Sequence, residues 1–516
     1  MPSANKGGRR RMVKMEDSVH GQIFNSNDLK QVGGSAEESY LALRQNIVRR
    51  YFPDATGVDD FMARVEMELC DYGFNADNSI AVLNLCRDEI CNSLKHKVKP
   101  IFGDPFNVHG LGGVLTCGVT GMGAGLSHCP QSPGEREKYV FFSFPHIAVN
   151  AAGELGEISR ASRHHSHACG AMLKVLGELK KEGHACSSHK VGQKEVHDVM
   201  DPEYSILKHR MEQHIGACGI PHNKLRLDTL TLLAEEAITQ DLETLISKAV
   251  DTSKADYAVI TGIQIHNWSM NFEDEEPNLE FIQPRSVYVV NNGVKTVLDI
   301  GAVSALTPRM FQMLSAPSSA PAPAHAAYTS KGALKAGAGD QDDPKSKQAI
   351  INGMKVEKKY AKYIRPSHGS AEESYLALRQ NILGRYFPDA VGADDFVARI
   401  EMELCQHGFT SENTIAVLNL CRDEICNSLK HKIQPIFGAP FNVHGLGGVL
   451  TCGVTGMGAG LSHAPQVRPG AREKYVFFSF PHIAVNAAGE LGEVGRASRG
   501  HSHACGAMFK VLGELK

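Results

Sequence analysis

Residues 79–98 read SIAVLNLCRDEICNSLKHKV, a short apolar run that passes directly into a segment of helical character. An uninterrupted run of isoleucine, valine and leucine of this length, ahead of a helical pattern, is typical of a buried strand. Strands that alternate with helices along a chain build a sheet flanked by helices. This stretch therefore predicts an α/β fold.

The same stretch returns as TIAVLNLCRDEICNSLKHKI at residues 414–433. The repetition is longer than the motif, because residues 34–180 recur almost unchanged as residues 369–516. A duplication of this size marks a self-contained building block, so we expect a tandemly repeated fold. Most positions are identical in the two copies, so loss of a residue from one copy is more informative than its retention.

Composition and charge describe a globular chain of two to four domains. Of its 516 residues 42% are hydrophobic and 22% are charged, and the net charge of −3 provides no basic surface for nucleic acid. No apolar run reaches the roughly 18 residues of a membrane-spanning helix. Thirteen cysteines are too few for a disulfide scaffold in a chain this long, and they favour metal or catalytic roles for some of them.

The domains follow from the duplication. We expect a polar tail over residues 1–33, which lacks the apolar segment of a secretory signal, and a first domain over 34–315. A linker rich in proline, alanine and glycine occupies 316–368, and a second domain occupies 369–516. The second copy ends at the point where the first reaches Lys180. It therefore lacks the following part, and the first copy is expected to be the better formed.

That following part of the first copy has clear signals of its own. Asp201-Pro202 predicts the start of a helix, and apolar residues at helical spacing predict another over 228–250. Residues 255–268 predict a strand, and residues 286–300 predict a hairpin that turns at Asn-Asn-Gly.

Three residues of the duplicated block could carry chemistry. Cys86 lies where the apolar strand passes into a helix, His146 closes the apolar run VFFSFP in the predicted buried strand at 138–150, and Cys169 precedes a helix. Helix amino termini favour thiolates, and a Cys/His/Cys set leaves the fourth tetrahedral position of a catalytic zinc open. The spacings match no local zinc signature, and buried cysteines that act as small apolar residues are the alternative.

The order of these motifs resembles the β-carbonic anhydrases. The sequence more closely resembles the limiting CO2-inducible B family of algal plastids, which includes θ-type carbonic anhydrases. The stretches that carry this resemblance are AVLNLCRDEICNSLKHK (81–97), FNVHGLGGVLTCGVTGMGAGLSH (106–128), FFSFPHIAVN (141–150) and HSHACGAM (165–172).

The resemblance implies an α/β enzyme with zinc bound by two cysteines and a histidine in each copy. His165 and His167 are alternatives to His146, and Cys117 is a reserve ligand. The implied zinc ligands are Cys86, His146 and Cys169 in the first copy and Cys421, His482 and Cys505 in the second.

The resemblance also implies a catalytic Asp–Arg dyad, with Asp88 as its carboxylate. The β-type motif is Cys-x-Asp-x-Arg, but position 90 here is Ile90, so the arginine must come from elsewhere. Arg87, Arg160 and Arg163 are candidates. Arg163 is favoured because it lies just before the second cysteine ligand.

Comparison of the two copies keeps the dyad and removes a rival ligand. Asp423 and Arg499 are the matching pair in the second copy. Cys129, in contrast, becomes Ala464, which counts against a role for that cysteine at a site working in both copies.

The implied reaction is reversible hydration of CO2 to bicarbonate by attack of a zinc-bound hydroxide. The alternative is a non-catalytic zinc-binding member that acts as a partner subunit in a carbon-concentrating complex. A redox protein is disfavoured because the chain has no Cys-x-x-Cys. The resemblance further implies a plastid location, in the stroma or pyrenoid, and either a homodimer or pairing of the two copies within the chain. No membrane partner is expected.

The glycine-rich stretch at 110–128 lacks the ending of a phosphate-binding loop and is best explained by close backbone packing. An anion-binding or proton-transfer role is the alternative. His109 and His128 flank it and recur as His444 and His463. They could carry protons or simply be packed.

Overall fold

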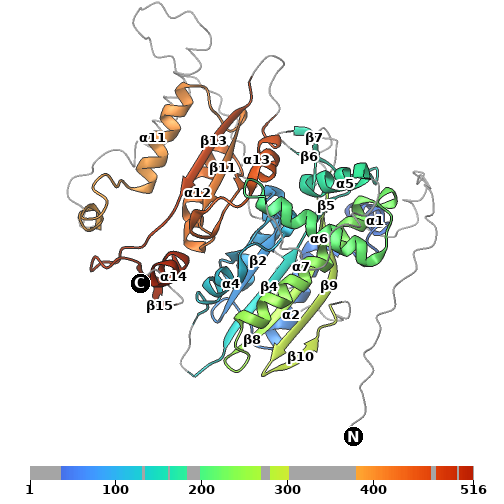
Figure 1. Cartoon of the computed structure of the whole chain (residues 1–516), viewed down its shortest axis with the longest axis horizontal. Helices are drawn as coiled ribbons and strands as arrows, with labels where there is room; N and C mark the ends of the chain where they lie inside the picture. The colour runs from blue at the N-terminus through green and yellow to red at the C-terminus, as the bar shows by residue number, and fades with distance from the viewer. Residues whose placement is uncertain are drawn as a thin grey trace, which may run out of the picture.

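In the computed structural model each copy forms its own α/β unit, and the two units lie side by side (Figure 1). We call them the first and the second repeat. The expected tail at 1–33 and linker at 316–368 lie outside the described residues. The structure describes residues 36–130, 134–160, 163–182, 198–268, 279–300, 379–465, 472–496 and 499–514.

The first repeat is built on a mixed sheet whose strand order is β1-β9-β8-β4-β2-β3, with β5 beside β8 and β10 beside β9. Strands β3, β2, β4, β5 and β8 run parallel where they pair, and β9 is antiparallel to β8. The strands are β1 (Thr56–Gly57), β2 (Ser79–Leu85), β3 (Phe106–Asn107), β4 (Glu137–Phe144), β5 (His146–Ala148), β8 (Ala255–Asn267), β9 (Leu279–Asn291) and β10 (Val294–Val297).

Helices cover both faces of this sheet, which confirms the predicted α/β fold. Successive strand residues point to opposite faces, so Leu83 packs with α2 and α3 while Val82 packs with α4 and the end of α7. The helices are α1 (Ala36–Arg49), α2 (Val58–Asp71), α3 (Asn92–Phe102), α4 (Gly118–Leu126), α5 (Gly170–Glu182), α6 (Pro202–Cys218) and α7 (Leu227–Ala249).

Most sequence expectations for these elements are confirmed. Asp201 is the residue before α6, and Pro202 is its first residue. The expected single strand at 138–150 is wrong, because Pro145 divides it into β4 and β5. Proline has no N–H to donate to a neighbouring strand, and its carbonyl oxygen instead accepts a hydrogen bond from Gln264 N at 3.0 Å.

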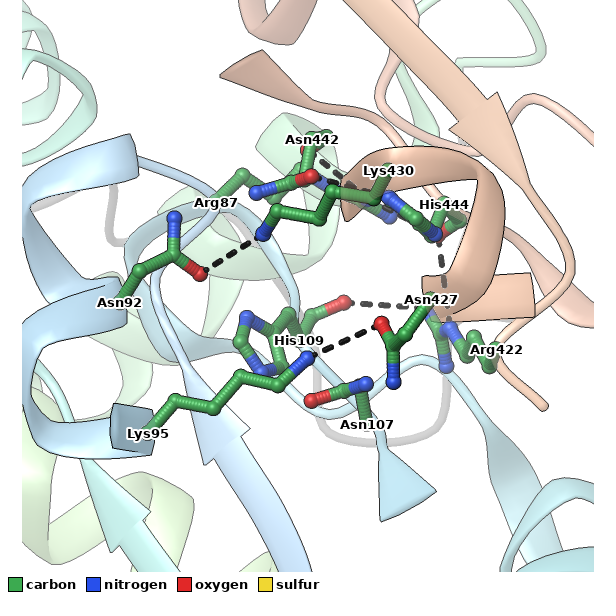
Figure 2. A pocket seen from close by; sticks show the side chains of 10 residues that line it. All are labelled: Arg87, Asn92, Lys95, Asn107, His109, Arg422, Asn427, Lys430, Asn442 and His444. Carbon is green, nitrogen blue, oxygen red and sulfur yellow. Dashed lines mark hydrogen bonds between the residues drawn. The ribbon is translucent and has the colours of Figure 1, made fainter. Parts of the chain in front are cut away.

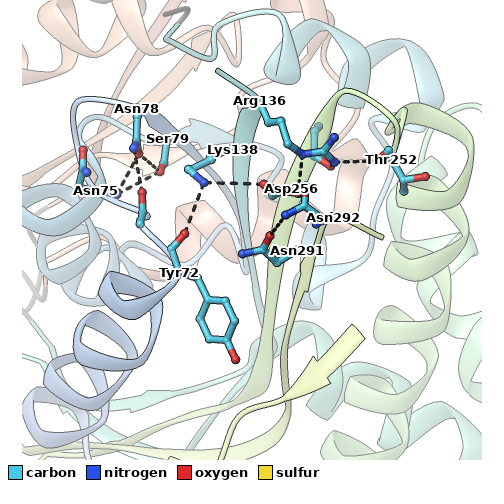
Figure 3. Close-up of polar contacts among 12 residues, drawn as sticks. Tyr72, Asn75, Asn78, Ser79, Arg136, Lys138, Thr252, Asp256, Asn291 and Asn292 are labelled. Atoms are coloured by element: carbon cyan, nitrogen blue, oxygen red, sulfur yellow. Dashed lines mark hydrogen bonds and ion pairs between the residues drawn. The ribbon is translucent and has the colours of Figure 1, made fainter. Parts of the chain in front are cut away.

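The predicted hairpin turn is confirmed between β9 and β10. Asn292 and Gly293 have φ values of 49° and 78°, the left-handed conformation that two-residue hairpin turns require. The buried carboxylate of Asp256 accepts hydrogen bonds from Asn292 N and from Arg136 Nε, both at 2.8 Å (Figure 3). These contacts fix the turn to the beginnings of β4 and β8.

The glycine-rich stretch is closely packed, as expected. α4 lies against β3, and a Cβ added to Gly125 would be 2.7 Å from Cδ1 of Phe106. The second repeat has the same arrangement, because a Cβ on Gly460 would be 2.6 Å from Cδ1 of Phe441. Small residues are therefore needed here for the helix to approach the sheet.

The second repeat has a parallel three-stranded sheet in the order β12-β11-β13. Its described residues contain no counterparts of α6, α7, β8 and β9. Its elements are α11 (Ala393–Gln406), β11 (Thr414–Leu420), α12 (Asn427–Phe437), β12 (Phe441–Asn442), α13 (Gly453–Ser462), β13 (Lys474–Phe480), β14 (Glu493–Arg496), β15 (Arg499–His503) and α14 (Gly506–Glu514).

Apolar residues that α6, α7 and β8 help to bury in the first repeat are exposed in the second. Phe477 on β13 is 56% exposed, whereas the matching Phe141 is fully buried. Met508 on α14 is 57% exposed, whereas the matching Met172 is fully buried. The first repeat is therefore the more completely covered of the two, within the described residues.

The two repeats pack through reciprocal contacts. Lys95 Nζ of the first repeat donates to Asn427 Oδ1 at 3.1 Å, and Lys430 Nζ of the second donates to Asn92 Oδ1 at 3.2 Å. The matched contacts give the pair an approximate two-fold relation. Contacts of this kind are what pairing of the copies within one chain requires.

Candidate metal centre

The sheet brings Cys86 and His146 together at one edge. β2 and β4 are parallel neighbours in which Leu85 pairs with Phe144, so the residues that follow the two strands emerge side by side. Cys86 follows β2 directly, and His146 opens β5 after Pro145. Ends of parallel strands gather functional side chains in this way.

Cys169 completes the group from the residue just before α5. Its Sγ lies 3.7 Å from Sγ of Cys86, and the ligand atoms of both cysteines and of His146 all lie within 4.8 Å of one another. All three residues are buried. We call this group centre 1.

The geometry of centre 1 fits zinc. Two sulfur ligands about 2.3 Å from a tetrahedral zinc lie about 3.8 Å apart, close to the observed separation of the two sulfurs. The donor set of two thiols and an imidazole is also one that zinc prefers. Three ligands from the chain would leave the fourth position for a small molecule.

The hydrogen bond between the two thiols shifts their pKa values in opposite directions. A hydrogen bond with Cys169 and burial raise the pKa of Cys86 well above its ordinary value. The same hydrogen bond lowers the pKa of Cys169, and backbone N–H groups of Met172 and Ala171 at the start of α5 lower it further. Cys169 is thus the more acidic thiol of the pair, in agreement with its place before a helix.

The second repeat has the equivalent group, centre 2, formed by Cys421, His482 and Cys505. Its sulfur atoms lie 3.6 Å apart, and its three ligand atoms also lie within 4.8 Å of one another. A hydrogen bond from Cys421 lowers the pKa of Cys505 to about 4. The side chain of His482 is 14% exposed, whereas His146 is fully buried, so centre 2 is the more open.

Asp88 lies beside centre 1. One carboxylate oxygen accepts a hydrogen bond from Ile90 N at 3.3 Å, which fixes the turn after Cys86. The other oxygen lies 3.9 Å from Nε2 of His146. Asp423 has the same relation to His482 at 3.8 Å.

Each centre is approached by a histidine of the other repeat. The sequence pointed to His128 and His463 as possible proton carriers, but not to their place beside the opposite centre. Nδ1 of His463 donates to Glu89 Oε2 at 2.6 Å and lies 3.9 Å from Asp88 Oδ1. Reciprocally, His128 lies 2.5 Å from Glu424. The sequence shows only that these histidines are present in both copies. Their contacts with the opposite repeat are shown by the structure.

The structure removes one of the three candidates for the arginine of the dyad. Arg87 is wrong for that role, because its buried guanidinium donates to the carboxylate of Glu203 on α6, at 2.7 Å from Nε. The side chains of Arg160, Arg163 and Arg499 lie outside the described residues. Arg163 therefore stays a prediction.

The substitute ligands differ in their placement. The side chain of His167 is 56% exposed and lies 3.0 Å from Glu157, outside the metal-binding groups found among the described residues. The side chain of His165 lies outside those residues, and the buried Cys117 joins none of the groups.

A second set overlaps centre 1. Cys91 and His266, both buried, lie with His146 so that their three ligand atoms are within 4.8 Å. His266 comes from β8, a strand with no counterpart in the described second repeat, and its Nδ1 lies 3.3 Å from Glu280. Because this set cannot form in both repeats, centre 1 is the better candidate for a shared function.

An α/β sheet with a cysteine and a histidine after neighbouring parallel strands, and a second cysteine before a helix, is the arrangement of the β-carbonic-anhydrase-like class. The particular family follows from sequence comparison. The family model described as limiting CO2-inducible proteins B/C beta carbonic anhydrases matches residues 55–291 and 390–516, and the chain belongs to this family.

Solved structures of this family are similar to the chain. The crystal structure of limiting CO2-inducible protein LCIB is 49% identical, with 49% of this chain and 96% of that chain covered and a TM-score of 0.40. PtLCIB4, a homolog of that protein, is 20% identical, with 49% and 98% covered and a TM-score of 0.40. A comparison with curated proteins found no match.

Membership in this family supports a carbonic-anhydrase-like role connected with limiting CO2. Among the described residues, no helix has both the length and the apolar character needed to cross a membrane.

Proposed function

We propose that the chain is a carbonic anhydrase that interconverts CO2 and bicarbonate at zinc held by centre 1 and centre 2. The observation that carries this proposal is the convergence of two buried sulfur atoms 3.7 Å apart with the ring nitrogen of His146. Family membership supports the substrate.

When bound, zinc would lower the pKa of a coordinated water to about 7 and so supply a nucleophile for CO2 at neutral pH. Cys86 and Cys169 would hold the ion as thiolates, and His146 would bind through a ring nitrogen. All three residues are buried, so an ion that they hold would be shielded from bulk water.

Asp88 would accept a hydrogen bond from the reacting oxygen, because one of its carboxylate oxygens lies 3.9 Å from Nε2 of His146. The Asp88–Arg163 dyad, with Asp423 and Arg499 in the second repeat, is the arrangement we propose for keeping this carboxylate ionised. A guanidinium beside the carboxylate would favour the acceptor form.

His463 would carry the proton that hydration releases. Its Nδ1 is 2.6 Å from Glu89 and 3.9 Å from Asp88, so this imidazole of the second repeat would link Asp88 beside centre 1 to the carboxylate of Glu89, whose side chain is 14% exposed. The two ring nitrogens of an imidazole can accept a proton on one side and donate one on the other, which suits proton transfer. In this arrangement each centre depends on both repeats.

Stopped-flow CO2 hydration by the zinc-loaded full chain tests the proposal. We expect activity in the parent and loss of the contribution of centre 1 in Cys86→Ala. Cys129→Ala is the matched control, because Cys129 is also a buried cysteine and the second repeat has Ala464 at that position. Absence of activity in a folded, zinc-loaded parent would refute the proposal.

One observation favours a second candidate function, that of a partner subunit in a carbon-concentrating complex. Phe477, Met508 and Leu512 in the second repeat are all more than half exposed. Exposed apolar groups of this kind mark interaction surfaces. Size-exclusion chromatography with light scattering on the inactive, folded parent would test for assembly.

The plastid stroma or pyrenoid is the location that we propose from family membership. Imaging of the tagged full-length protein in algal cells tests this placement.

A further inference from the structure

A cavity lies between the two repeats on their approximate two-fold axis (Figure 2). Its volume, counted as the positions open to the centre of a water-sized sphere, is about 20 Å³, which is room for one small molecule. Five side chains from each repeat line it, at matching positions. Those of the first repeat are Arg87, Asn92, Lys95, Asn107 and His109.

The charge of the lining is one-sided. The lining side chains include two arginines and two lysines and no aspartate or glutamate. The nearby carboxylate of Glu203 binds Arg87 and lies 3.8 Å from Nη2 of Arg422, so one carboxylate faces two guanidinium groups. Lys95 and Lys430 add further positive charge, and the cavity is therefore suited to an anion.

Buried donors in one half of the cavity have no partner. Nη1 of Arg422, Nε2 of His109 and Nδ2 of Asn427 make no hydrogen bond to any described residue. Their side chains belong to residues that are 2%, 7% and 6% exposed. An unsatisfied buried polar group costs about 1–3 kcal/mol, so three in one cavity need a hydrogen-bonding partner, which water or a bound ion can supply.

The same half also contains an unused acceptor, Oδ1 of Asn107. In the second repeat the matching His444 and Asn442 bond to each other, at 3.0 Å from Nε2 to Oδ1. The His109–Asn107 pair stays open instead. Several donors beside one acceptor match an anion that has oxygen acceptors and also an O–H group to donate.

We propose that this cavity binds one small oxyanion that carries an O–H group, the chemical class of hydrogen phosphate and bicarbonate. The anion would accept hydrogen bonds from Arg422, His109 and Asn427, and its O–H would donate to Asn107. It would link the two repeats, because these partners belong to both.

The two lysines support this assignment. Burial, and then repulsion from Lys430, lowers the pKa of Lys95 to about 7, and burial lowers that of Lys430 to about 8. An anion bound between the two lysines would raise both pKa values again, because it stabilises the charged ammonium groups. Lys95 uses one of its three N–H groups on Asn427, which leaves others for a ligand.

The test is thermal unfolding of the full chain in hydrogen phosphate, bicarbonate or sulfate, at matched ionic strength, together with calorimetric titration. A ligand that binds the folded state raises the unfolding midpoint with concentration. We expect hydrogen phosphate or bicarbonate to do so and sulfate, which has no O–H group at neutral pH, to bind at least tenfold more weakly. Equal binding of sulfate, or no midpoint shift with any of the three, would overturn the proposal.

Two variants locate the site. The double variant Lys95→Met, Lys430→Met should lose the anion-dependent shift. It also removes the hydrogen bonds to Asn427 and Asn92, so the shift is measured from the variant's own midpoint in anion-free buffer. Lys97→Met is the matched control on the same helix, because Lys97 is partly exposed and contacts Asp59 outside the cavity.

The metal centres are a competing place for an anion. The variant Cys86→Ala, Cys421→Ala should therefore keep the anion-dependent shift. Loss of the shift in that variant would place the anion at the metal centres and overturn the proposal, whatever the result for CO2 hydration.

Discussion

Removal of the buried carboxylate of Glu203 should destabilise the first repeat strongly. Glu203 is fully buried and receives hydrogen bonds from Arg87, from Leu111 N at 3.0 Å and from Thr451 of the second repeat at 2.8 Å. Burial disfavours its charge, but the attraction of Arg87 outweighs burial and lowers its pKa from 4.5 to about 2.

The magnitude follows from that pKa. Lowering the pKa of Glu203 from 4.5 to about 2 corresponds, at about 1.4 kcal/mol for each tenfold change in the ionisation equilibrium, to roughly 3.5 kcal/mol. Removing one partner of a buried ion pair costs about 3–5 kcal/mol, which agrees. We therefore expect Glu203→Gln to lose about 3–5 kcal/mol of unfolding free energy at neutral pH.

The pH dependence has a definite sign. A carboxylate with a lowered pKa in the folded state stabilises the protein above its unfolded pKa, and this contribution is lost as pH falls through the folded pKa. The stability difference between parent and Glu203→Gln should thus be complete above about pH 4.5 and shrink toward pH 2.

Urea unfolding followed by tryptophan fluorescence measures this difference, because the single tryptophan, Trp268, packs against the core of the first repeat. Glu178→Gln is the control, since Glu178 pairs with Lys208 at 3.0 Å on a partly exposed surface and should cost about 1 kcal/mol or less. A cost for Glu203→Gln no greater than the control would refute the reasoning.

Three further predictions concern the metal, the proton and the packing. In centre 2 the pKa of Cys421 is raised and that of Cys505 is lowered to about 4. Zinc loading of that centre at about pH 6, below the titration of a zinc-bound water, should therefore release about one proton, which comes from Cys421. Release near zero in a pH-stat titration of Cys86→Ala, which keeps only centre 2, would contradict this assignment. His463→Ala should slow CO2 hydration by about 10²-fold at the affected centre in weak buffer and be rescued by added imidazole, whereas no recovery would exclude proton transfer through that residue. Gly125→Ala should lower the free energy of urea unfolding by about 1–3 kcal/mol, because the new Cβ meets Phe106. Gly123→Ala is the control, because the space around that position is open and the substitution should not destabilise the protein. Equal effects of the two substitutions would contradict the close packing.

Local patterns in the sequence predicted most of the fold. The apolar run at 79–85 became β2, Asp201-Pro202 began a helix, and the Asn-Asn-Gly turn joined two strands. Each of these features is determined by residues close together in the chain, and a local sequence pattern can therefore predict it. The division of 138–150 at Pro145 was missed, because a proline within an apolar run does not show which strand lies beside it.

The candidate site was predicted in its residues but not in its surroundings. Cys86, His146 and Cys169 were named from strand ends, a helix start and a family resemblance. The approach of His463 to Glu89 joins residues far apart in sequence, and only packing of the two repeats brings them together. Glu203 had no signal either, because a glutamate in the first turn of a helix usually faces water.

Exchange of ¹⁸O between labelled CO2 and water, measured by mass spectrometry on the zinc-loaded full chain, tests the central claim most directly. The account predicts exchange well above the uncatalysed rate in the parent, a reduced rate in Cys86→Ala and in Cys421→Ala, and only the uncatalysed rate in the double variant. Exchange in the double variant equal to that of the parent would contradict the account, as would a zinc-loaded parent that only matches the uncatalysed rate.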